Sequence, residues 1–89
     1  MPERLFKIDI STPEKTIYEG EISSLIAPGE LGYFGILVDH APFIANLVPG
    51  KIIIKNGAAK PTMFNCKSTG IIEVLKNNVN VLVDSVEWD

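Results

Sequence analysis

The sequence is poor in the residues that most often build cross-links and metal centres. Its 89 residues include one cysteine, Cys66, and one histidine, His40. A single cysteine cannot form an internal disulfide, which suits a reducing compartment. One cysteine and one histidine would also need two carboxylates to complete a tetrahedral metal site. We therefore predict a cytoplasmic protein that holds no metal and no other cofactor.

Positive charge and long apolar runs are also scarce. The 8 Lys and Arg residues form no block and are outnumbered by 11 Asp and Glu, for a net charge of −3. Binding to nucleic acid or to an anionic membrane surface needs a concentrated basic patch. The longest apolar runs, such as Ile52–Ile54 and Val81–Val83, fall far short of the roughly 18–20 residues that span a bilayer. Met1–Arg4 leads directly into a strand pattern, so we predict no secretory signal.

Apolar residues, in contrast, are plentiful. Hydrophobic residues make up 46% of the chain and charged residues 21%. The mean hydropathy of +0.22 also differs from that of disordered chains. At this length the chain has room for one compact domain, which we expect to cover residues 1–89.

Apolar and polar residues alternate along most of the chain, as in strands that bury one face. Proline, glycine and asparagine interrupt the alternation repeatedly, and no helical period persists. The pattern predicts an all-β fold, an antiparallel β-sandwich or barrel of about eight to ten short strands. The expected strands cover residues 6–10, 16–27, 36–38, 43–48, 51–55, 62–67, 71–75 and 79–83.

Individual residues predict local detail. Gly20, between two glutamates, is typical of a β-bulge. The three glycines between residues 29 and 35 predict a loop or tight hairpin. Asn56–Gly57 predicts a hairpin turn, because both residues tolerate positive φ. We expect Phe64 and Cys66 on one face of the returning strand.

Catalytic constellations are weak in this sequence. His40 lies in a predicted turn, whereas Cys66 lies in an apolar strand, so we predict a core cysteine and not a nucleophile. Glu19 and Glu21 share a strand face, which is more typical of a solvated surface than of an acid–base pair. The glycine-rich span lacks the Gly-Lys-Ser/Thr ending of a phosphate loop. We therefore predict that the protein is not an enzyme.

The remaining interpretation is binding to another molecule. Apolar side chains gather around the glycine-rich span and the turn at residues 39–42, and an exposed apolar patch most often marks a partner surface. These side chains are Tyr33, Phe34, Ile36, Leu37, Phe43 and Ile44. For Ile36 and Ile44, capping the core is an equal alternative. For His40, the alternative is a local hydrogen bond within the turn.

Short motifs follow one another in a specific order along the chain. They are Thr12–Lys15, Tyr18–Glu21, Ala27–Gly29, Gly32–Pro42, Pro49–Gly50, Gly70–Val74 and Val81–Ser85. The most specific part is Gly35–Leu37 followed by His40–Pro42 and then Pro49–Gly50. In this order and spacing, nearly the whole chain resembles the epsilon subunit of the rotary ATP synthase.

The resemblance implies a flattened antiparallel β-sandwich of about ten short strands. It also implies a non-catalytic subunit of the central stalk, or rotor, which docks the gamma subunit onto the c-ring. Such a subunit supports the coupling of proton flow to ATP synthesis. It would lie peripherally at the cytoplasmic face of the bacterial inner membrane and touch the membrane only through the complex.

Site residues follow from the same resemblance. Those implied to face the gamma subunit are Ser11, His40, Ala41 and Pro42. Those implied to face the c-ring loops are Glu30, Leu31, Gly32 and Tyr33. The resemblance implies no catalytic residue, no metal and no cofactor.

The sequence departs from the family pattern in two respects. Val38 stands where the family usually has a proline before the His-Ala-Pro turn, so the turn geometry is expected to differ. Family members usually continue into a two-helix hairpin, which can inhibit ATP hydrolysis and in some members binds ATP. The sequence here stops at Asp89. We therefore expect no helical hairpin, no inhibition through a helical arm and no ATP binding.

One alternative from a different class remains. A stand-alone β-sandwich of this size could bind a small molecule or a carbohydrate. That alternative predicts a concave pocket with convergent polar groups, whereas the rotor interpretation predicts a flat apolar patch near His40.

Overall fold

The computed structural model describes residues 4–88, which contain ten β-strands and no helix. Accordingly, no helix among these residues is long and apolar enough to cross a membrane. Residues 1–3 and 89 lie outside the described residues, and with them parts of the predicted domain 1–89 and of Met1–Arg4. The strands are β1 (Phe6–Ser11), β2 (Thr16–Ile22), β3 (Ser24–Gly29), β4 (Gly32–Leu37), β5 (Phe43–Leu47), β6 (Gly50–Lys55), β7 (Thr62–Cys66), β8 (Gly70–Leu75), β9 (Asn78–Val83) and β10 (Val86–Trp88).

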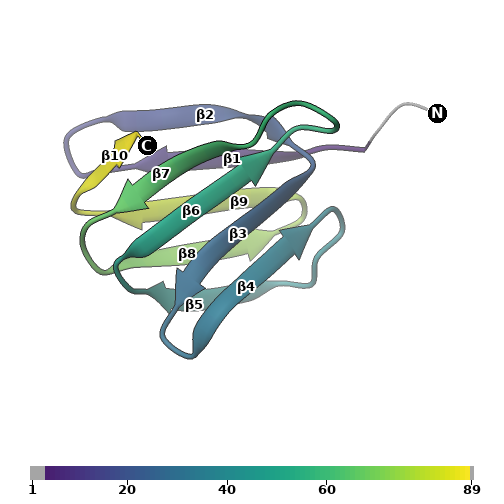
Figure 1. The fold of residues 1–89 in the computed structure, drawn as a ribbon. Coiled ribbons are helices and arrows are strands. Elements are labelled where there is room, and N and C mark those ends of the chain that lie inside the picture. Colours follow the sequence, from purple (N-terminus) through teal and green to yellow (C-terminus); the bar gives the residue numbers. More distant parts are fainter. Residues whose placement is uncertain (1–3, 89) are drawn as a thin grey trace.

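The strands form one continuous sheet that curls over into two layers (Figure 1). One layer, here called the β3 sheet, holds β10, β7, β6, β3 and β4. The other, here called the β8 sheet, holds β5, β8, β9, β1 and β2. The layers are joined where Gly29 of β3 pairs with Leu47 of β5. The predicted all-β sandwich of about ten short strands is therefore confirmed.

One strand pair differs from the predicted antiparallel pairing. β1 runs parallel to β9, with Ile8 opposite Val79 and Ile10 opposite Val81. Side chains alternate between the two faces of a strand whichever way its neighbour runs. The apolar pattern of these segments therefore identifies them as strands without giving the direction of pairing.

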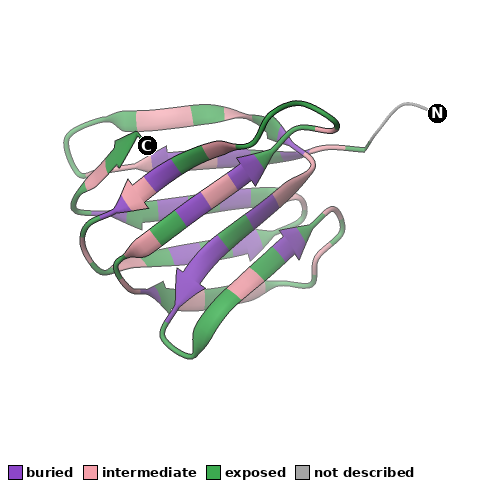
Figure 2. Cartoon of the chain, viewed as in Figure 1, coloured by how far each residue is buried: buried purple, intermediate pink, exposed green. Residues whose placement is uncertain are grey.

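The core fills the space between the two layers and is made almost entirely of aliphatic side chains. Along the strands, buried residues alternate with exposed ones, seen as purple bands in Figure 2. The buried hydrophobic residues are Phe6, Ile8, Ile10, Ile22, Leu25, Ala27, Ile36, Leu47, Ile52, Ile54, Phe64, Cys66, Ile72, Val74, Val79, Val81 and Val83. The predicted placement of Phe64 and Cys66 on one buried face is confirmed.

The predicted bulge at Gly20 is wrong. The ladder between β1 and β2 is regular from Phe6–Ile22 to Ile10–Tyr18, and its register shifts only between Ile10 and Ser11. A Cβ atom on Gly20 would lie 3.3 Å from the hydroxyl oxygen of Tyr18. The glycine therefore makes room for the Tyr18 ring, which packs edge-on against Phe64.

The glycine-rich span is more regular than predicted. Only residues 30 and 31 form the turn, and β4 already begins at Gly32, where φ is +122°. Tyr33 and Phe34 pair with Pro28 and Ala27, so most of the expected loop is the second strand of a hairpin. The predicted hairpin at Asn56–Gly57 is present between β6 and β7, with positive φ at Gly57.

Candidate functional site

The segment His40–Pro42 leaves a tight turn at the end of β4. The backbone N–H of His40 donates to the carbonyl oxygen of Leu37 at 3.2 Å, and Asp39 has a φ of +63°. Positive φ at the second central residue only is the pattern of a type II turn. Val38 therefore occupies the first central position, where proline is common.

His40 itself is held within the segment. Its Nδ1 atom is 2.7 Å from the carbonyl oxygen of Ala41, and its ring packs edge-on against Phe43 with centroids 5.6 Å apart. The ring is half-buried, whereas Ala41 and Pro42 are exposed. The local hydrogen bond is thus formed, and the segment presents Ala41 and Pro42 to solvent.

Four exposed aliphatic side chains lie on the outer surface of the β8 sheet. Ile71 of β8 is directly opposite Leu82 of β9, and Ile44 of β5 is opposite Glu73. Residues diagonal across neighbouring strands are also within reach of long side chains, so Ile44 borders both Ile71 and Leu75. Ile44, Ile71, Leu75 and Leu82, here called the apolar face, are each between 44% and 66% exposed.

The predicted gamma-facing residues border this apolar face. Ser11 pairs in register with Leu82, and its hydroxyl donates to a carboxylate oxygen of Asp9. At the other end of the sheet, Pro42 lines a shallow hollow together with Ile44 and Leu75. Ser11 therefore lies apart from His40–Pro42, with the apolar face between them.

The turn between β3 and β4 carries the residues predicted to face the c-ring. At its tip, the Leu31 side chain is fully exposed. Glu30 accepts a hydrogen bond from the side-chain amide of Asn46 at 3.0 Å. Tyr33 instead lies back over the β3 sheet, where its hydroxyl oxygen accepts a hydrogen bond from the backbone N–H of Lys51 at 3.0 Å. The tip of the turn thus consists of Glu30 and Leu31, with Gly32 beside them.

The apolar residues singled out in this region divide into two groups. Ile36 is buried in the core, and the rings of Phe34 and Phe43 pack edge-on with centroids 5.2 Å apart. Ile44 is 66% exposed, so the alternative that it caps the core is wrong. Leu37 is also exposed, at the end of β4.

The structure supports a core role for Cys66. The residue is 3% exposed, and its thiol donates to the carbonyl oxygen of Ser68 at 3.1 Å. Burial raises the pKa of the Cys66 thiol, which keeps it protonated. Among residues 4–88, no group of three or more His, Cys, Asp and Glu side chains is placed to hold a metal ion.

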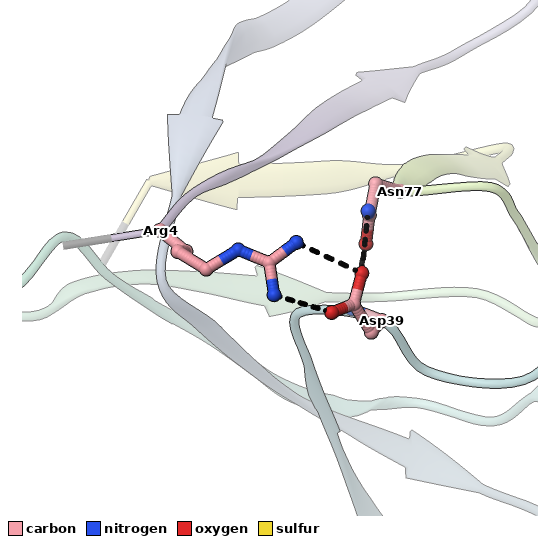
Figure 3. Close-up of polar contacts among 3 residues, drawn as sticks. All are labelled: Arg4, Asp39 and Asn77. Atoms are coloured by element: carbon pink, nitrogen blue, oxygen red, sulfur yellow. Dashed lines mark hydrogen bonds and ion pairs between the residues drawn. The ribbon is translucent and has the colours of Figure 1, made fainter.

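A cluster of charged and polar groups beside His40 was not expected from the sequence. The Arg4 guanidinium bonds both carboxylate oxygens of Asp39, and Asn77 bonds Asp39 from the other side (Figure 3). These residues lie far apart along the chain. The only sequence signal is the Asn77–Asn78 turn, which gives no partner for Asp39.

The alternative of a small-molecule or carbohydrate module receives no support. Within residues 4–88, no polar or charged side chain is buried. Pockets for small ligands combine an enclosed apolar lining with a few precisely placed polar groups. The fold and its exposed surfaces instead define a small β-sandwich domain that presents turns and an apolar sheet surface to other proteins.

Comparison with known proteins gives this class a family. Residues 5–89 match the family described as ATP synthase, Delta/Epsilon chain, beta-sandwich domain. The chain therefore belongs to this family of β-sandwich domains.

Curated relatives agree with this assignment. The ATP synthase epsilon chain of Desulfosudis oleivorans is 40% identical over 87 residues, which cover 98% of this chain and 64% of that protein. The ATP synthase epsilon chain of Leptospira interrogans is 37% identical over 84 residues, which cover 94% of this chain and 65% of that protein. This chain thus spans slightly less than two thirds of the length of these relatives.

Solved structures share the fold at low sequence identity. A chain in the cryo-EM structure of the Euglena gracilis mitochondrial ATP synthase superposes with a TM-score of 0.86 and 16% identity, covering 99% of this chain and 55% of that chain. A chain in the Tetrahymena thermophila mitochondrial ATP synthase central stalk and c-ring has a TM-score of 0.76 and 17% identity, covering 97% and 68%.

Proposed function

We propose that this protein is a non-catalytic subunit of the central stalk of a proton-translocating ATP synthase. In this role it docks the gamma subunit onto the c-ring and supports the coupling of proton flow to ATP synthesis. The observation that carries the proposal is the family match over residues 5–89, which covers the whole sandwich. The subunit supplies no catalytic residue and binds no ATP; its contribution is mechanical.

The gamma subunit docks on the outer surface of the β8 sheet. Ser11 lies at one border of this surface and His40, Ala41 and Pro42 at the other. The apolar face between them offers side chains that a partner can bury, and burial of apolar area is the main favourable term in most protein association.

The c-ring loops dock at the turn between β3 and β4. Leu31 at the tip offers an apolar contact, and Glu30 beside it offers a carboxylate to a basic loop residue. An exposed ion pair contributes at most about 1 kcal/mol, so Leu31 carries most of the contact. Gly32 and Tyr33 fix the turn, because φ is positive at Gly32 and Tyr33 is anchored to Lys51.

The subunit is peripheral at the cytoplasmic face of the bacterial inner membrane. Its gamma and c-ring contacts account for its position there, because its charge is −3 and its basic residues are scattered. Contact with the membrane is made only through the complex.

Site-directed cross-linking in the assembled ATP synthase tests both contacts. The buried thiol of Cys66 is shielded from reagents, so a new surface cysteine can be labelled selectively with a photoreactive maleimide. Ala41→Cys is expected to cross-link to gamma and Leu31→Cys to the c-ring. Met63→Cys, on the outer surface of the β3 sheet, is the control and is expected to cross-link to neither. Cross-links of Ala41→Cys and Leu31→Cys to neither partner would refute the proposal.

A matched pair of substitutions tests which surface binds gamma. Ile71 on the β8 sheet is 44% exposed, and Ile26 on the β3 sheet is 42% exposed. Threonine keeps the β-branched shape that suits a strand and replaces apolar surface by a hydroxyl. Ile71→Thr is expected to weaken binding to purified gamma by roughly fivefold or more, and Ile26→Thr to leave it unchanged. Equal affinities of the two variants would place gamma elsewhere.

A further inference from the structure

Two tight turns face each other at the end of the sandwich where β5 begins. One joins β4 to Pro42 and contains Asp39, and the other joins β8 to β9 and contains Lys76 and Asn77. The backbone N–H of Asp39 donates to Oδ1 of Asn77 at 2.7 Å. In return, the side-chain amide of Asn77 donates to Oδ1 of Asp39 at 2.9 Å. The two side chains thus form a reciprocal pair across the turns.

The segment before β1 joins the same pair. Nη1 of Arg4 donates to Oδ2 of Asp39 at 2.5 Å, and Nη2 donates to Oδ1 at 3.2 Å (Figure 3). The backbone N–H of Lys7 donates to the carbonyl oxygen of Asn77 at 2.9 Å. Three segments that are distant in sequence therefore meet at Asp39, each through a bond with a defined direction.

The backbone at this junction is in a conformation that needs support. Asp39, Lys76 and Asn77 have φ values of +63°, +49° and +61°. Residues other than glycine adopt this left-handed region at a cost, although Asn and Asp tolerate it better than most. The reciprocal Asp39–Asn77 bonds favour this conformation over the extended alternatives.

His40 follows Asp39 directly, so the turn sets the direction in which His40–Pro42 leaves the sandwich. Arg4 and Asp39 are exposed, with 67% and 53% of their side-chain surface open to solvent. Exposed pairs of this kind contribute little to global stability. A local effect on the neighbouring segment is therefore separable from an effect on the whole fold.

We propose that Arg4, Asp39 and Asn77 are positioning residues that hold the His40–Pro42 segment in the orientation in which it binds the gamma subunit. This inference rests on the proposed function for its binding partner. The network itself touches the partner only through the segment that it orients.

Glycine substitutions test the proposal without imposing backbone strain. Asp39→Gly and Asn77→Gly remove the reciprocal side chains and accept positive φ freely. Lys76→Gly is the matched control, because φ is also positive there and the Lys76 side chain lies outside the network. Asp39→Asn is the conservative variant, since its amide oxygen still accepts the hydrogen bond from Asn77 and asparagine tolerates the left-handed region.

Two measurements are made on each variant: affinity for purified gamma, and the NMR signals of the His40 ring and the Ala41 amide in the free protein. Asp39→Gly and Asn77→Gly are expected to lower affinity by roughly threefold to tenfold and to shift or broaden these signals. Lys76→Gly is expected to match the wild type in both measurements, and Asp39→Asn is expected to recover most of the affinity and the signals.

Wild-type affinity in both Asp39→Gly and Asn77→Gly overturns the inference, as does an equal loss in Lys76→Gly. If the wild-type protein itself fails to bind gamma, the proposed function is wrong. The His40 and Ala41 signals then decide the positioning role alone, and unchanged signals in Asp39→Gly and Asn77→Gly overturn it.

Discussion

Gly70 lies so close to Val83 that a side chain on Gly70 has no room. A Cβ atom at position 70 would be 2.5 Å from Cγ1 of Val83 and 2.6 Å from the carbonyl oxygen of Leu82. The two residues are paired in the β8–β9 ladder, and Gly70 also pairs with Leu47 of β5. Because the obstructing atoms include backbone, relaxation requires the strands themselves to move apart.

We accordingly expect Gly70→Ala to lower the free energy of unfolding by about 1–3 kcal/mol, the usual cost of overpacking. Gly35→Ala is the matched control, because the nearest atom to a Cβ there is 3.8 Å away. Gly35→Ala is expected to leave stability unchanged or slightly raised. Urea unfolding of both variants measures the difference, and equal midpoints would contradict the close approach at Gly70.

The turn at Val38–Asp39 is expected to accept proline. Proline fixes φ near −65°, the value that the first central residue of a type II turn requires. The preceding residue, Leu37, is already in a strand, as a residue before proline prefers. Val38→Pro is expected to raise the free energy of unfolding by about 0.4–1 kcal/mol through the entropy of the unfolded chain. A lower midpoint of thermal unfolding than that of the wild type would show that the Val38 backbone does not fit proline.

The Asp39 carboxyl is expected to titrate at unusually low pH. The hydrogen bond from Asn77, and then that from Arg4, hold the pKa of Asp39 below its ordinary value. A depressed pKa in the folded state means that the stabilising contribution is present above the ordinary carboxyl pKa of about 4. That contribution is lost as pH falls through the lower folded-state pKa.

NMR titration of the Asp39 carboxyl measures this directly. Asn77→Gly is expected to raise the titration midpoint toward the ordinary value, and by more than Arg4→Ala does, because the Asn77 bond is the larger cause. An unchanged midpoint in both variants would show that these bonds do not persist in solution.

Cys66 is expected to resist alkylation in the folded protein. Its thiol is buried, and burial raises its pKa above the ordinary value, so little thiolate is available to react. The same sign means that the contribution of Cys66 to stability is lost as pH rises above the ordinary thiol pKa. Mass spectrometry after iodoacetamide treatment is expected to show no modification of the native chain in the time that modifies the urea-unfolded chain completely. Leu31→Cys serves as the reactive control, and rapid modification of Cys66 in the native protein would contradict its burial.

The alternation of residues predicts the sandwich and most of its core. Phe64, Cys66 and Ile72 occupy the faces that the pattern assigns to them, because one buried face is enough to fix which residues point inward. Gly20 shows the limit of such inference. A glycine in a strand accommodates either a bulge or a neighbouring ring, and the Tyr18 ring that decides between them lies in the same strand.

The candidate surfaces were less accessible to prediction. The position of Leu31 at a turn tip follows from the glycines on both sides of it. The exposure of Ile44 and Ile71 depends on which sheet surface is left uncovered, and alternation alone leaves that open. The Arg4–Asp39–Asn77 cluster depends on three segments meeting in space, and its residues carry no periodic signal.

The parallel ladder between β1 and β9 bears on how the protein reaches its fold. The segments that it joins stand near opposite ends of the described chain, with Lys7 opposite Asn78. During synthesis, β1 and β2 can form a hairpin early, but that hairpin has no neighbour in the sheet until β9 has left the ribosome. Closing so long a loop is entropically costly, and topologies rich in such distant pairings fold slowly. The newly made chain therefore passes through an interval in which the inner face of the β1–β2 hairpin is open to solvent and to chaperones.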